Sequence, residues 1–245
     1  MEKRNSASIS GAGKISGGSY ERVTISGAGK VTGDLEADEL RIAGAGKVDG
    51  RVRAREIVVS GSTTFSNSVH GDEMRVSGSA RIDGRVEVKE LKCSGNLRVN
   101  GGIEAQYLKT SGHLRVGGDV AAEIFKASGG FQIAGLLSAD RVEINLGGRC
   151  TAEEIGGEKI IVRRGGWREK GILFDGLIKL FTGGGTEELH ARLIEGDEVY
   201  LEDTIADTVR GKIVEIGPGC RIETVEYSES LQVADSAVVR NRAKV

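Results

Sequence analysis

The sequence repeats itself every 17 residues, about nine times in succession. A period this short is too small for a helix–turn–helix unit. It suits one coil of a β-solenoid, in which each repeat buries its apolar side only against its neighbours. The first interval is 16 residues and the later ones are 17. The first residues of the aligned repeats, called position 0, are Ile9, Ile25, Ile42, Val59, Val76, Cys93, Thr110, Ala127 and Ile144.

Two columns of the aligned repeats hold glycine. Gly stands at position 2 in eight repeats and at position 8 in seven. Glycine tolerates positive φ angles that other residues avoid. We therefore expect two corners in each coil that are fixed by backbone conformation rather than by side chains.

The other columns alternate between apolar and charged residues. Positions 6, 10 and 15 are apolar and position 12 is small, so these columns are expected to point inward and stack. Positions 5 and 16 are mostly basic. Position 14 begins acidic, and like charges about 4.8 Å apart on neighbouring strands repel. The basic column at position 16 is expected to offset the acidic residues Glu39, Glu56, Glu73 and Glu90.

Composition narrows the function. The 245 residues include 38 glycines, one proline and only 4% aromatic residues, which suits repeated tight corners around a narrow core. The net charge of −2 leaves no nucleic-acid footprint, and we interpret the basic columns as a solvated face. Cys93, Cys150 and Cys220 fall at inward positions 0, 6 and 4 and match no zinc spacing, so we expect reduced core thiols, no metal and no cofactor.

The 17-residue pattern fails after Ile161 and later returns. Val199, Ile216 and Val233 are again one period apart, as are Ile205, Ile222 and Val239. The sequence therefore predicts a flexible tail over 1–8, a main solenoid over 9–161, an irregular segment over 162–192, a second solenoid segment over 193–240 and a charged tail over 241–245.

The irregular segment contains an apolar stretch over 172–181 with helical periodicity. It makes only about three turns, so it needs a surface to lie on. That surface is a flank or open end of the solenoid, a membrane interface or a partner protein. The residues predicted to make this contact are Trp167, Leu173, Phe174, Leu177, Ile178, Leu180 and Phe181.

The recurring apolar-Ser-Gly start with a second apolar-x-Gly corner, as in Val76–Gly84, resembles the bactofilins. These are bacterial polymer-forming cytoskeletal proteins. The resemblance covers residues 9–161, and Ile194–Glu202 in the second segment looks like a two-part, Firmicutes-type member. It implies a right-handed parallel β-helix that assembles end to end into filaments without nucleotide, often at the membrane. The cellular location it implies is cytoplasmic, peripheral at the inner face of the cell membrane.

The ends of a solenoid present unpaired backbone groups. The first repeat begins at Ile9 and only the short polar segment Met1–Ser8 precedes it, which makes a poor cap. An uncapped end can pair with another copy of the chain or with a paralogue by strand addition. If both ends join like to like, the filament has no polarity. The predicted polymerisation residues are Ile9, Ile15, Val233 and Val239.

An enzyme is the alternative, either a β-helix carbohydrate-active enzyme or an acyltransferase-like protein. The left-handed acyltransferase type has 18 residues per coil, which argues against it. Only His70, His113 and His190 could serve as bases, and the first two share no face, so we expect three solvated loop residues. No small-molecule substrate is predicted. Nor does the sequence show a signal peptide or an apolar run of ~18 residues.

Overall fold

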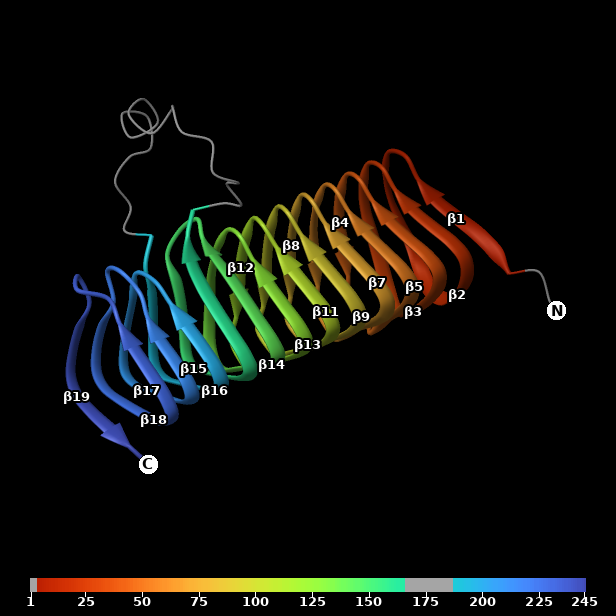
Figure 1. The fold of residues 1–245 in the computed structure, drawn as a ribbon. Helices are drawn as coiled ribbons and strands as arrows, with labels where there is room; N and C mark the ends of the chain where they lie inside the picture. The colour runs from red at the N-terminus through yellow and green to blue at the C-terminus, as the bar shows by residue number, and fades with distance from the viewer. Residues whose placement is uncertain (1–3, 166–186) are drawn as a thin grey trace, which may run out of the picture.

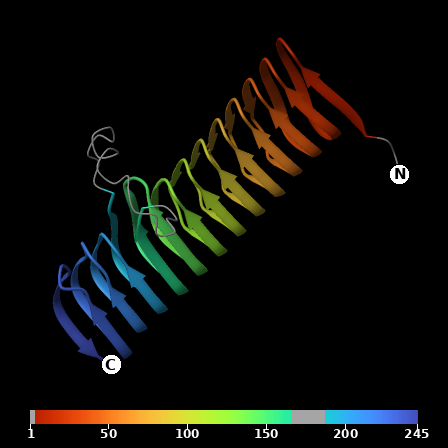
Figure 2. The same ribbon diagram turned by 45° about the horizontal axis from the view of Figure 1, so that its top comes forward.

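A computed structural model describes residues 4–165 and 187–245. The strands of these residues form one sheet that winds into a rod of about 13 coils, with strands in parallel and the termini at opposite ends (Figures 1 and 2). In Figure 1 the chain ascends on the near side, crosses the top and descends behind as it advances, so the coil is right-handed. The predicted all-β parallel solenoid is confirmed. The helix predicted at 172–181 lies outside the described residues.

Each coil in the middle of the rod consists of a short strand of four residues and a long strand of eight, whereas elsewhere the two merge into one bent strand. The strands are β1 (Asn5–Ile9), β2 (Ala12–Ile25), β3 (Ala28–Ile42), β4 (Ala45–Val48), β5 (Val52–Val59), β6 (Ser62–Phe65), β7 (Val69–Val76), β8 (Ser79–Ile82), β9 (Val86–Cys93), β10 (Asn96–Val99), β11 (Ile103–Thr110), β12 (His113–Val116), β13 (Val120–Ala127), β14 (Gly130–Leu146), β15 (Cys150–Arg164), β16 (Leu189–Leu201), β17 (Thr204–Ile216), β18 (Arg221–Val233) and β19 (Val238–Lys244).

The outermost strands extend further than the sequence suggested. β1 starts at Asn5, inside the segment 1–8 expected to be a tail, and β19 runs to Lys244, inside the segment 241–245. Both gain regular structure by pairing in parallel with the next strand. The second solenoid segment continues the same sheet, because β16 pairs directly with β15.

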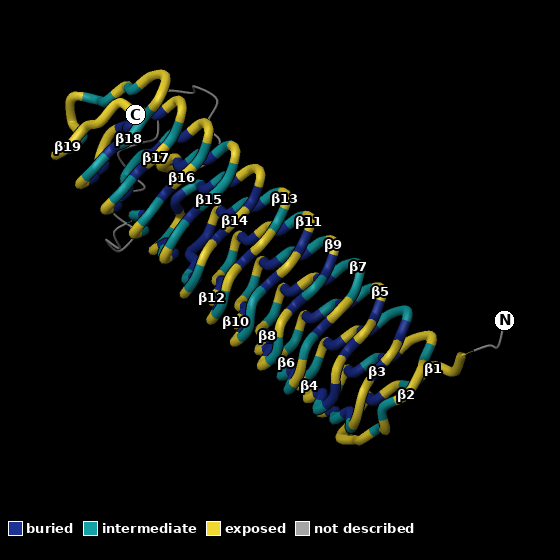
Figure 3. The backbone as a smooth tube through the Cα atoms, turned by 90° about the horizontal axis from the view of Figure 1, so that it is seen from below, coloured by how far each residue is buried: buried dark blue, intermediate teal, exposed yellow. Residues whose placement is uncertain are grey.

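The predicted columns are the observed register over the first nine repeats. Residues at position 0 pair in sequence from Ile9 with Ile25 to Ala127 with Ile144. Apolar residues therefore stack on equivalent residues one coil away, and buried residues recur at the same place in each coil (Figure 3). The 17-residue period is thus the length of one coil.

Two register predictions for the later coils are wrong. Val199 pairs with Val214 rather than Ile216, and Ala206 rather than Ile205 pairs with Ile222. This coil is shorter because both of its corners lose residues. One corner is only Glu202–Asp203, where Asp203 takes a φ of 42°.

Cys150 is also displaced from its predicted position. It pairs with Phe131 at position 4 instead of following Ile133 at position 6, because the corner Gly147–Arg149 is longer than the earlier ones. All three cysteines are nevertheless buried and free, as core thiols should be. Burial raises the pKa of Cys93, Cys150 and Cys220 to about 11, so the thiols stay protonated.

The glycines at position 2 are needed for a reason the sequence did not reveal. None of them has a positive φ, since the glycines that do are Gly18, Gly33, Gly165 and Gly219. Instead, a Cβ on Gly78 would lie 2.0 Å from the carbonyl oxygen of Gly61, one coil earlier. The same contact recurs at the position-2 corners from coil to coil. These corners are therefore fixed by close approach of backbone to backbone, and the expectation of positive φ there is wrong.

Positions 0 and 4 exchange volume along the rod. In the first three coils position 0 is Ile and position 4 is Gly, and a Cβ on Gly29 would lie 2.6 Å from Ile25 Cγ2. Further along, position 0 shrinks to Ala127 while position 4 grows to Phe131, which is fully buried and meets Phe125 edge to face at 5.5 Å. The interior stays filled although no single column keeps its size.

We expect Gly78→Ala to lower the free energy of unfolding by roughly 3 kcal/mol, because the coil carbonyls would have to separate to admit the methyl group. Thermal unfolding followed by circular dichroism measures this. Ser77→Ala, at the exposed neighbouring corner position, is the matched control and should leave the Tm unchanged. An unchanged Tm for Gly78→Ala would contradict the close-approach argument.

The volume exchange predicts coupling between Ile42 and Gly46. Gly46→Ala places a Cβ 2.9 Å from Ile42 Cγ2 and should cost about 1–3 kcal/mol, while Ile42→Ala should cost about 2–5 kcal/mol. The double variant should be more stable than the sum by at least about 0.5 kcal/mol in urea unfolding. Gly46→Ala combined with Leu91→Ala, in another coil, should be additive, and equal coupling in both pairs would refute the exchange.

Candidate functional site

The N-terminal face of the rod is formed by β1 and the first part of β2. β1 pairs with Tyr20–Ile25 of β2, and its other edge has no strand beside it within the described ranges. Ala12–Ser16 likewise pairs with β3 on one side only. Ile15 is half-buried, whereas Val31, the next residue in its column, is fully buried. This face therefore presents backbone hydrogen-bonding groups and an apolar side chain that the inner coils keep covered.

The C-terminal face has the same character. β19 pairs with Arg221–Tyr227 of β18, and Ser230–Val233 pairs only with β17 in the described part of the chain. Val238 is 56% exposed and Val239 is half-buried. In Figure 3 exposed residues gather at both end coils. Each face could accept a further strand by backbone pairing.

The four predicted polymerisation residues lie at these two faces. Ile9 is buried and Ile15 half-buried in the first coils, and Val233 and Val239 are half-buried in the last ones. The rod separates the two pairs (Figure 1). One copy of the chain therefore does not bring them together. The predicted contact residues from Trp167 to Phe181 lie outside the described residues.

Sequence reasoning missed Gly11 as a residue of the N-terminal face. A Cβ on Gly27 would lie 2.2 Å from the Gly11 carbonyl oxygen, so a side chain in this column points toward the preceding coil. A Cβ on Gly11 meets nothing within 4 Å. A side chain there would project from the face without disturbing the described fold. The repeat itself held this signal, in the first member of its glycine column.

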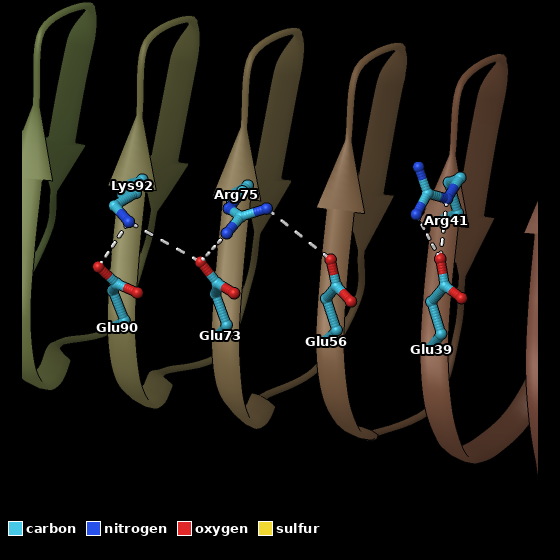
Figure 4. Close-up of polar contacts among 7 residues, drawn as sticks. All are labelled: Glu39, Arg41, Glu56, Glu73, Arg75, Glu90 and Lys92. Atoms are coloured by element: carbon cyan, nitrogen blue, oxygen red, sulfur yellow. Dashed lines mark hydrogen bonds and ion pairs between the residues drawn. The ribbon is translucent and has the colours of Figure 1, made fainter.

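The long-strand side of the rod carries the predicted acidic and basic columns (Figure 4). Arg75 places Nη2 2.6 Å from Glu73 Oε1, and its Nη1 lies 3.9 Å from Glu56 Oε1 in the coil before. Lys92 repeats this with Glu90 at 2.6 Å and Glu73 at 3.9 Å. The expected offset between the columns is confirmed. Each such exposed pair contributes at most about 1 kcal/mol, so the columns cancel repulsion more than they add stability.

Hydrogen bonds in these columns alter two carboxyl groups. The guanidinium groups of Arg41 and Arg22 both bind Glu39 and hold its pKa below the ordinary value. A hydrogen bond from Lys92 lowers the pKa of Glu90 in the same way. Both carboxylates thus stay ionised into mildly acidic solution.

The histidines lie in strands, so the expectation of loop residues is wrong. His70 is in β7, with Nδ1 3.0 Å from Glu87 Oε2, and His113 is in β12. His190 is in β16, with Nε2 3.4 Å from Glu188 Oε2. Over 4–165 and 187–245, no group of three or more His, Cys, Asp or Glu residues could hold a metal ion. The same ranges contain no helix with the length and hydropathy of a membrane span.

A stacked rod with open faces at both ends is the geometry that the bactofilin resemblance implies. Residues 4–104 match the bactofilin family. The matching model is described as bactofilin, polymer-forming cytoskeletal. It covers less than half of the chain and confirms the resemblance in the first coils of the solenoid, which are bactofilin-like.

Two curated relatives come from Bacillus subtilis (strain 168). YhbE, described as an uncharacterized protein, is 43% identical over 111 residues, which cover 45% of this chain and 43% of YhbE. YhbF, with the same description, is 35% identical over 114 residues, covering 45% and 42%. Each match spans less than half of the relative's own length. No solved structure matches the chain.

The lowered pKa of Glu39 makes a pH prediction. Its ion pairs stabilise the fold fully above about pH 4.3, the ordinary carboxyl pKa, and this stabilisation is lost as the pH falls through the lower folded-state value. Glu39→Gln should therefore lower the Tm at pH 7 by about 2 °C, and the difference from wild type should vanish in acid. Glu104→Gln is the control, since Glu104 is exposed and forms no ion pair with the described residues. A difference that persists unchanged at low pH would refute the assignment.

Proposed function

We propose that the protein is a structural, self-assembling scaffold that polymerises through the ends of its solenoid without nucleotide. The observation that carries this proposal is the pair of open end faces, each with unpaired strand edges and half-buried apolar residues. The bactofilin match over 4–104 supports it, because that family is described as polymer-forming and cytoskeletal. The partner in the filament is another copy of the chain or a paralogue.

Strand addition explains how such ends would join. Each added coil pairs its backbone with the exposed edge and covers residues such as Ile15 and Val239, as inner coils do for Val31. The hydrophobic gain per rung resembles that of one internal coil contact. No bound nucleotide is needed, because the edge is present in the folded subunit itself. The comparisons give no support to the alternative of a β-helix enzyme.

The location we propose is cytoplasmic, at the inner face of the membrane. Three buried free thiols suit a reducing compartment, and a cytoskeletal family suits the cell interior. The segment 172–181 lies outside the described residues, so its contact with a membrane, the solenoid or a partner stays a prediction.

We expect Gly11→Glu to stop assembly while the subunit stays folded. The new side chain would project from the N-terminal face, where an incoming strand must lie, and would introduce a charge there. Negative-stain electron microscopy should show filaments for wild type and short species for Gly11→Glu. Ile15→Lys, on the same face, should act alike, and Val239→Lys tests the C-terminal face.

Ser94→Glu is the matched control, since it adds the same charge at an exposed corner in the middle of the rod. It should form filaments as wild type does. Circular dichroism verifies that all variants are folded. Normal filaments from folded Gly11→Glu and Val239→Lys would exclude end pairing at those faces, and wild-type protein that stays monomeric would overturn the scaffold proposal.

A further inference from the structure

The short-strand side of the rod carries a column of cations at position 5. Its members lie on parallel strands one coil apart, and register places them directly beside one another. Thr64 interrupts the column once. We call this the cation column, and its members are Lys14, Lys30, Lys47, Arg81, Arg98 and Arg115.

Acidic residues at position 7 neutralise part of the cation column. Asp49 lies 2.8 Å from Lys30 Nζ and 3.3 Å from Lys47 Nζ. Asp83 accepts a hydrogen bond of 2.9 Å from Arg81 Nε. The fold thus supplies a counter-charge wherever position 7 is an aspartate.

This counter-charge is missing beside Arg98 and Arg115. Position 7 in their coils is Asn100 and Gly117. The Asn100 amide donates a 2.8 Å hydrogen bond to Asp83, the nearest aspartate of the column. Neither arginine forms an ion pair within 4 Å with any other described residue, and both are exposed. Two stacked guanidinium groups therefore lie without an anion of their own.

A shallow depression of about 360 Å³ lies along the two arginines. Its lining includes Arg81, Arg98 and Arg115 on one side and Ser79, Asn96 and His113 on the other, and no carboxylate is among the lining residues. Hydroxyl, amide and guanidinium groups on adjacent strands thus converge on one hollow. Each can donate hydrogen bonds to an anion.

We propose that this depression binds phosphate groups. A guanidinium fork matches phosphate oxygens with two parallel hydrogen bonds, and a tetrahedral phosphate has enough oxygens to accept from the forks of Arg98 and Arg115 together. A carboxylate has only two oxygens, which one fork occupies. The volume exceeds that of a single phosphate ion, so the ligand is a phosphorylated molecule or a lipid headgroup. The site lies within one copy of the chain and is independent of assembly.

The test titrates inorganic tripolyphosphate into the full-length protein by isothermal titration calorimetry. The wild type should bind, and Arg98→Gln with Arg115→Gln should weaken binding by at least about tenfold, since charged hydrogen bonds are lost. Lys30→Gln with Lys47→Gln is the matched control. It removes the same charge from the same column, where Asp49 already serves both lysines, and should change affinity less than about twofold. Arg98→Lys should fall between, because it keeps the charge and loses the fork.

A second arm identifies the source of the phosphate. Co-sedimentation with vesicles of phosphatidylcholine and phosphatidylglycerol, against phosphatidylcholine alone, reports headgroup binding. Loss of pelleting in the arginine pair assigns a lipid, and tripolyphosphate binding without pelleting assigns a soluble phosphate. No binding of either probe, or equal loss in both double variants, overturns the site. Filament formation by electron microscopy is read separately, so failure here is distinguishable from failure of end pairing.

Discussion

The structure depends on one constraint: each coil can bury its apolar residues only against the same positions of the coils before and after it. The interior must therefore keep a nearly constant cross-section, and the backbone corners must approach to contact distance. Gly78 against the carbonyl of Gly61 is where this approach is closest. The exchange of Ile25 and Gly29 for Ala127 and Phe131 keeps the interior filled as the residues change. The rod is the outcome of satisfying this one requirement about 13 times.

The same constraint explains what the sequence could predict. Inward columns had to repeat with the coil, so the register from Ile9 to Ile144 followed from spacing alone. Corners obey a weaker rule, since they point outward and can gain or lose residues while the strands stay aligned. The short corner at Asp203 and the long one before Cys150 moved the later register for this reason. Spacing measured along the chain could not separate a change in a corner from a change in a strand.

The candidate sites divide in the same way. The end residues Ile15 and Val239 could be found because they are the first and last members of apolar columns. Gly11 could not, because its importance lies in a direction, toward a coil that is absent, which only the backbone reveals. Arg98 and Arg115 were visible as basic residues. That they lack the aspartate given to Arg81 emerged only when position 7 was placed beside position 5.

The stacked corners also make the subunit a ruler. Backbone contact at every glycine corner leaves no room for compression, and strand spacing sets the rise, so 13 coils measure roughly 60 Å. The first three coils carry nearly the same residues, Gly-Ala-Gly-Lys at Gly11, Gly27 and Gly44. Duplicating or deleting such a coil changes the length of the rod by one rise while both end faces keep their shape. Spacing along a polymer of such rods could thus evolve in single-coil steps, with its junctions untouched.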